Sequence, residues 1–182
     1  QVGTVFTIAN AGAAEAYGFE GSLDWRVAPG LDLFSTYGYS HARFAEGAYK
    51  DNSFRLSPDH SLSLAASWTF DALGGTFNIR PSYSWQSEVF FDDDNDRAVF
   101  QQPPAAFVAD NLQDERQEAY GLLNLRASYR PDGTKVAFEV FATNLTDEDY
   151  IIDAGNTGDS LGLPTFIAGP PRMVGASIGW KF

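Results

Sequence analysis

Seven segments of the chain alternate between apolar and polar residues, and the last of them runs to the final residue. In that segment Val174, Ala176, Ile178, Trp180 and Phe182 share one face, while glycine, serine and lysine occupy the other. Successive side chains of a strand point to opposite faces, so this period of two predicts a β-strand with one apolar surface. An alternating strand that ends on an aromatic residue is typical of an outer-membrane β-barrel, whose apolar face meets lipid.

The other six segments follow the same rule, at about residues 17–26, 31–40, 61–70, 77–86, 123–130 and 136–143. None of the seven apolar faces carries a charge, whereas the opposite faces carry charges, hydroxyl groups, amides and glycines. This separation fits a wall between lipid and a polar lumen. Pro81 cannot donate a backbone hydrogen bond in mid-strand, so we expect a β-bulge there.

Aromatic residues gather near the ends of these strands, which predicts two girdles at the membrane interfaces. One girdle would contain Trp25, Phe70, Phe77, Tyr129 and Phe182, and the other would contain Tyr37, Tyr39, Tyr83 and Trp85. The connections alternate as well. Those at 28–30, 71–75 and 131–133 are short, and those at about 45–58, 91–117 and 145–169 are long. Outer-membrane barrels have short periplasmic turns and long extracellular loops, so every connection obeys the rule.

The composition limits the other possibilities. The 182 residues suffice for one domain, and no run approaches the ~18 apolar residues of a membrane helix, although a barrel strand crosses with only ~10 alternating residues. The absence of cysteine excludes disulfides, thiolate zinc sites and a cysteine nucleophile. The net charge of −12 disfavours binding to nucleic acid. A complete bacterial barrel has an even number of strands, so seven strands suggest a segment of a larger barrel.

Four short motifs occur in a fixed order along the chain: residues 10–12 (NAG) followed by 17–20 (YGFE), 119–124 (AYGLLN), 144–150 (NLTDEDY), and 162–164 (GLP) leading to 169–172 (GPPR). In this order, and with a terminal Phe182, the sequence resembles the TonB-dependent outer-membrane receptors. The resemblance implies that residues 1–182 form the C-terminal part of an antiparallel barrel of about 22 strands. In this family an N-terminal plug fills the lumen and a TonB box contacts the energy-transducing partner, and both are missing here.

The same resemblance implies a function in active uptake across the bacterial outer membrane, most often of an iron–siderophore complex or another scarce nutrient. The partners it implies are the TonB complex, the ligand, outer-membrane lipid and lipopolysaccharide, and the barrel assembly machinery, and it implies no cofactor. The apolar residues of the terminal strand resemble the outer-membrane assembly signal: Val174, Ala176, Ile178, Trp180 and Phe182.

The long loops are the acidic part of the chain, with fourteen acidic against four basic residues. Such loops attract cations or cationic ligands, or are simply solvated. Asp92, Asp94 and Asp96 have the spacing that begins an EF-hand calcium loop, but Arg97 stands where that loop needs glycine and Pro103 where it needs glutamate. Candidate ligand contacts combine aromatic and basic loop side chains: Phe90, Phe91, Arg97, Phe100, Arg116 and Phe166.

Two other architectures are compatible with the alternation. A complete barrel of eight strands with a structural or adhesion role needs residues 1–9 to pair with 172–182. A soluble β-sandwich binding module would bury Trp25, Trp68, Trp85 and Trp180 in one core. We expect no enzyme, because the two histidines lie in no Ser/His/acid or metal-ligand spacing, and no G-x-S-x-G or phosphate-loop motif is present.

Overall fold

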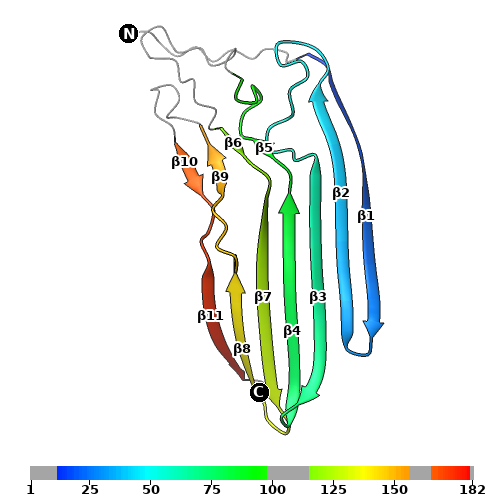
Figure 1. Cartoon of the computed structure of the whole chain (residues 1–182), viewed down its shortest axis with the longest axis vertical. Helices are drawn as coiled ribbons and strands as arrows, with labels where there is room; N and C mark the ends of the chain where they lie inside the picture. Colours follow the sequence, from blue (N-terminus) through cyan, green and yellow to red (C-terminus); the bar gives the residue numbers. More distant parts are fainter. Residues whose placement is uncertain (1–11, 98–114, 156–164, 181–182) are drawn as a thin grey trace.

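The computed structural model describes residues 12–97, 115–155 and 165–180, and its main element is one curved antiparallel sheet of seven strands (Figure 1). In spatial order the strands are β1 (Ala14–Ala28), β2 (Leu31–Phe44), β3 (His60–Ala72), β4 (Gly75–Gln86), β7 (Tyr120–Pro131), β8 (Val136–Thr143) and β11 (Met173–Trp180). All seven predicted strands are therefore present. The described residues contain no helix long and apolar enough to cross a membrane.

Two short strand pairs, which the alternation pattern did not predict, extend the loop end of the sheet. β5 (Val89–Phe90) pairs with β6 (Arg116–Gln117), and β9 (Ile151–Ala154) pairs with β10 (Phe166–Ala168). Figure 1 shows both pairs at the end of the sheet opposite the C-terminus, where the described parts of the long connections also lie. The short turns all lie at the other end, so the predicted division between short turns and long loops is confirmed.

The register keeps each predicted face intact across the sheet. Arg26 pairs with Asp32, Ser67 lies opposite Asp32 on the next strand, and Arg80 pairs with Arg126. A slip of one residue would move every side chain of a strand to the other face, so this agreement shows that one set of positions forms one continuous polar surface. We call this surface the luminal face and the opposite one the outer face.

The outer face is covered by no second layer among the described residues. Trp25 is 54%, Trp68 48% and Trp180 63% exposed, and Ile178 is 75% exposed. A sandwich would bury these side chains between two sheets, so the β-sandwich alternative is wrong. For the eight-stranded alternative, β1 and β11 are the two edges of the described sheet, and the required partner at residues 1–9 lies outside the described residues.

The expected bulge at Pro81 is wrong. Ala65 pairs with Ser82 and Trp68 with Ile79, which is the same register on both sides of the proline, and Pro81 itself pairs with Leu125 of β7 without interruption. The missing N–H is accommodated by a local gap in the pairing of β3 with β4. No extra residue is needed, because proline takes away a donor but does not lengthen the strand.

Both girdles contain ring contacts. Towards the turns, Trp68 lies 4.5 Å from Phe70 between ring centroids, Phe70 5.4 Å from Phe77, and Phe77 4.5 Å from Tyr129. Towards the loops, Phe19 packs on Tyr37 and Tyr39, and the two histidines join the same belt through stacking on Tyr17 and Tyr37. Phe182, predicted for the first girdle, lies outside the described residues.

Candidate ligand-binding surface

The loop after β2 is held against the end of the sheet by a small, partly buried cluster. The ring of Phe44 lies 4.7 Å from that of Phe54 and 5.7 Å from that of Tyr49. Arg43 donates two hydrogen bonds to the carboxylate of Asp59, at 2.9 and 2.7 Å. A bidentate guanidinium–carboxylate pair fixes direction as well as distance, so it anchors the end of the loop where β3 begins.

Asn52 and Asn95 join this loop to the one that follows β5. The carboxamide of Asn95 accepts from the Ser53 N–H at 2.6 Å and donates to the Ser53 carbonyl at 2.9 Å, while Asn52 donates to the Asp93 carbonyl at 2.9 Å. Asn52 is only 2% exposed and Asn95 9% exposed. Sequence reasoning missed both residues. Asn95 has a φ of 54° in the structure, which asparagine tolerates better than most residues do.

The acidic run mainly organises its own backbone. Asp92 accepts from the N–H of Asp94 at 3.4 Å, Asp94 from that of Asp96 at 2.7 Å, and Asp96 from that of Glu115 at 3.2 Å. Asp96 is 1% exposed. Within the described ranges no group of three or more His, Cys, Asp or Glu side chains could hold a metal ion. The predicted calcium site therefore lacks a ligand set in that part of the chain.

The same carboxylates act on Tyr49, which lies beside them. Burial and then the negative charges of Asp92, Asp94 and Asp93 raise the pKa of the Tyr49 phenol above its ordinary value, because both disfavour the phenolate. The phenol therefore stays neutral at physiological pH.

The predicted ligand contacts differ in burial. Phe91 is 8% exposed and belongs to the interior of the loops, and Arg97 donates to the Asn52 side chain at 2.8 Å. Phe90 pairs with Arg116 across β5 and β6, and Phe166 on β10 is 50% exposed. Phe100 lies outside the described residues. The structure thus separates the supporting residue Phe91 from the exposed residues Arg116 and Phe166.

One hydrogen bond links the strand of Arg116 to the hairpin that carries Phe166. Arg116 forms ion pairs with Glu88 at 3.3 Å and with Glu118 at 3.7 Å, so its charge is partly neutralised. The next residue, Gln117, accepts from the N–H of Ile151 at 2.7 Å and thereby ties β6 to the β9–β10 hairpin that carries Phe166. This hydrogen bond holds the described parts of two different loops next to each other.

The motif at residues 144–150 has a structural role. Asn144 is 4% exposed, and its carboxamide donates to the carbonyl groups of Glu148 and Pro170 at 2.9 and 3.3 Å and accepts from the Glu148 N–H at 2.8 Å. Arg172 and Asp147 form an ion pair at 3.0 Å beside it. Together they fasten the loop after β8 to the segment that leads into β11.

The predicted terminal signal lies mostly within β11. Val174 and Ile178 are each 75% exposed and Trp180 is 63% exposed on the outer face, with Ala176 between them. Phe182 is outside the described residues, and recognition of this strand by an assembly machinery stays a prediction.

Comparison with known proteins gives one family and one fold. The profile of the family described as TonB dependent receptor-like, beta-barrel, matches residues 1–145. The solved ferric yersiniabactin uptake receptor FyuA from Yersinia pestis superposes with a TM-score of 0.76 at 21% identity, over 94% of this chain and 24% of that one. No curated protein sequence matched.

Two further receptors have the same fold. BauA, the ferric preacinetobactin receptor of Acinetobacter baumannii, gives a TM-score of 0.69 at 16% identity, over 93% of this chain and 22% of that one. The ferripyoverdine receptor of the outer membrane of Pseudomonas aeruginosa gives 0.64 at 20% identity, over 93% and 20%. This chain spans between a fifth and a quarter of the length of the three receptors. Because the family profile covers residues 1–145 of 182, the chain belongs to the TonB-dependent receptor-like β-barrel family, and its strands form part of a barrel wall in the bacterial outer membrane.

Proposed function

We propose that the protein containing this chain takes up a ferric siderophore, or a similarly scarce nutrient, across the outer membrane with energy from the TonB complex. The observation that carries the proposal is the superposition of more than nine tenths of the chain on receptors of ferric yersiniabactin, ferric preacinetobactin and ferripyoverdine. The family is one of receptors and not of enzymes, which agrees with the lack of a catalytic motif in the sequence.

Within this chain the ligand would meet the parts of the loops that contain β6 and β10. Phe166 offers an exposed ring and Arg116 a guanidinium group, a combination that suits the aromatic and anionic parts of a ferric siderophore. The acidic loops around them work against an anionic cargo, so a neutral or cationic complex would approach more easily. Phe91 supports the loops from below and would not touch the ligand.

The remaining partners follow from position in the membrane. Lipid and lipopolysaccharide would contact the outer face, and the barrel assembly machinery would recognise the terminal strand through Val174, Ala176, Ile178, Trp180 and Phe182. The TonB complex would act through a region outside this chain.

The test uses the full-length receptor in a strain from which it has been deleted. Uptake of radioactive iron is measured under iron limitation with a panel of anionic, neutral and cationic siderophores, and the transported complex is then used for binding measurements. We expect Phe166→Ala to weaken its binding about tenfold, as loss of a contact residue does. The matched control, Phe91→Ala, should lower thermal stability and leave the affinity of the folded receptor unchanged. If iron uptake from every siderophore is the same with and without the receptor, the assignment of a ferric siderophore as the cargo is wrong.

A further inference from the structure

The outer face has an apolar hollow between the two girdles. The hollow has a volume of about 460 Å³ and is lined mainly by apolar side chains of β1, β2, β3, β4 and β7. On β2 it lies at Leu33 and Ser35, and on β3 it lies at Leu64 and Ala66. Ser35 is the cross-strand partner of Leu64, and Leu33 is that of Ala66. The two small side chains are therefore diagonal neighbours, and they form the floor of the hollow.

One aromatic residue from each girdle forms a wall of the hollow. Trp25 on β1 stands at one side and is 54% exposed, and Tyr83 on β4 stands at the other. The Tyr83 ring passes over Gly121 of β7, where a Cβ atom would clash with the phenol. The sheet itself therefore sets the position of this wall. Because girdle residues mark the two membrane interfaces, the hollow between them lies at the depth of the hydrocarbon.

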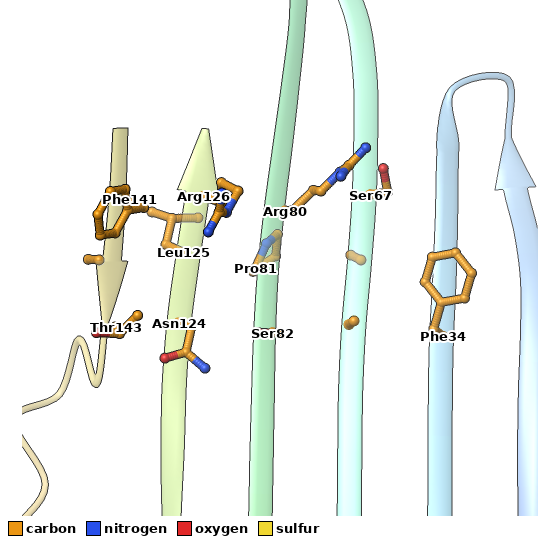
Figure 2. A pocket seen from close by; sticks show the side chains of 13 residues that line it. Phe34, Ser67, Arg80, Pro81, Ser82, Asn124, Leu125, Arg126, Phe141 and Thr143 are labelled. Atoms are coloured by element: carbon orange, nitrogen blue, oxygen red, sulfur yellow. The ribbon is translucent and has the colours of Figure 1, made fainter. Parts of the chain in front are cut away.

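The luminal side of the same strands has the opposite chemistry. Figure 2 shows Arg80 of β4 extending towards β3, on which Ser67 lies, and Arg126 on β7. A polar molecule finds hydrogen-bonding and charged groups on that side of the wall. The hollow on the outer face offers mainly carbon atoms, so its chemistry suits a hydrocarbon chain.

A hollow in a lipid-facing wall can bind a lipid chain more tightly than the rest of the wall does. Lipid tails are as apolar as the side chains they touch, so van der Waals contact, and not the hydrophobic effect, decides how tightly a chain binds within the bilayer. A chain on a flat surface touches protein on one side, whereas a chain in the hollow touches the floor and both walls. The additional contacts are individually weak but add up along the chain.

We propose that the hollow binds one acyl chain of a phospholipid. It is continuous with the lipid-facing surface, and a stable interface with a second copy of the protein buries about 1,000 Å² or more, which a hollow of this volume does not provide by itself. Lipopolysaccharide carries phosphates, which guanidinium groups bind. Arg43, which the alternation places on the outer face towards the loops, is already held by both carboxylate oxygens of Asp59. The site does not depend on the cargo, so it can fail while the proposed uptake function holds.

Native mass spectrometry of the full-length receptor tests the site. It identifies the molecules that stay bound after purification in mild detergent, and it then counts the lipids that bind when the stripped receptor is titrated with dipalmitoyl phosphatidylethanolamine. Ala66→Trp fills the floor of the hollow. The matched control is Ala127→Trp, which places the same side chain on the same face of β7, opposite Ile79 and Val140 and outside the hollow.

We expect Ala66→Trp to bind one phospholipid fewer than wild type, or to bind it about tenfold more weakly, and Ala127→Trp to bind as wild type does. If Ala66→Trp does not fold, as judged by its thermal melting, Ser35→Leu fills the same floor with a smaller side chain. Equal phospholipid binding by the hollow-filling variant and Ala127→Trp would overturn the proposal. So would the loss, in the hollow-filling variant, of a bound lipopolysaccharide or of a second copy of the receptor in place of a phospholipid.

Discussion

Asn144 ties the loop after β8 to the segment that leads into β11, and the effect of its replacement can be worked out from the contacts. Its side chain makes three hydrogen bonds, to the N–H and carbonyl of Glu148 and to the carbonyl of Pro170. At about 1 kcal/mol each, their loss costs about 3 kcal/mol. The φ of 48° adds about 1 kcal/mol for alanine, which has neither the tolerance of asparagine nor the freedom of glycine in that region.

We therefore expect Asn144→Ala to lower the free energy of unfolding of the full-length receptor by about 4 kcal/mol and Asn144→Gly by about 3 kcal/mol. Thr146, which is exposed in the same motif, provides the control, and Thr146→Ala should stay within about 0.5 kcal/mol of wild type. Urea unfolding in lipid vesicles gives the free energies. Limited proteolysis should also show faster cleavage between residues 145 and 172 in the two Asn144 variants.

The most specific expectation is that Asn144→Ala loses more stability than Asn144→Gly. If glycine destabilises as much as alanine or more, the reasoning from φ is wrong. If both variants unfold like Thr146→Ala, the three hydrogen bonds do not hold the loop to the segment before β11.

Three further predictions concern the faces, one turn and one loop. Val140 is 56% exposed on the outer face, so Val140→Arg should lower the free energy of unfolding in vesicles by about 2 to 4 kcal/mol. Ser177 lies opposite Glu139 on the luminal face, so Ser177→Arg should lower it by less than about 1 kcal/mol. Equal losses would contradict the assignment of faces. Leu73 has a φ of 53° in a two-residue turn with Gly74, and its side chain is 86% exposed. Because asparagine tolerates this φ better than leucine does, Leu73→Asn should raise the free energy of unfolding by about 1 kcal/mol in the same urea assay. A decrease would show that the leucine side chain has a stabilising contact of its own. The raised pKa of Tyr49 means that the folded protein holds the phenolic proton more tightly than the unfolded chain does. The resulting stability is present below about pH 10 and is lost as the pH rises above it. Absorbance at the phenolate band should show Tyr49 titrating after the exposed tyrosines, and titration together with them would refute its burial beside Asp92.

The wall could be predicted because its signal is local. A period of two is read from neighbouring residues, and the absence of charge at Leu62, Leu64 and Trp68 specifies which face meets lipid before any partner strand is known. The prediction at Pro81 was wrong because a proline in a regular strand and a proline at a β-bulge cannot be distinguished by sequence. The structure distinguishes them only through the register on both sides.

The loop end could not be predicted to the same degree because its contacts join distant residues. Asn52 forms a hydrogen bond with Asp93, and Asn95 forms one with Ser53, in each case across more than forty positions of the sequence. Neither asparagine belongs to a recognisable sequence pattern. The same holds for Phe91, whose burial depends on which loop lies over it. Aromatic and basic residue types alone could not separate this supporting side chain from the exposed Phe166.

The central claim is that the outer face meets lipid and the luminal face does not. This chain contains no cysteine, so single cysteines placed along β3 from Ser61 to Phe70 can each carry a spin label in the full-length receptor, freed of any other cysteines and reconstituted in vesicles. We expect collision with dissolved oxygen, which concentrates in lipid, to alternate with a period of two and to peak at Leu62, Leu64, Ala66, Trp68 and Phe70. A profile without alternation, or one with its maxima at the serine positions 61, 63 and 67, would contradict it.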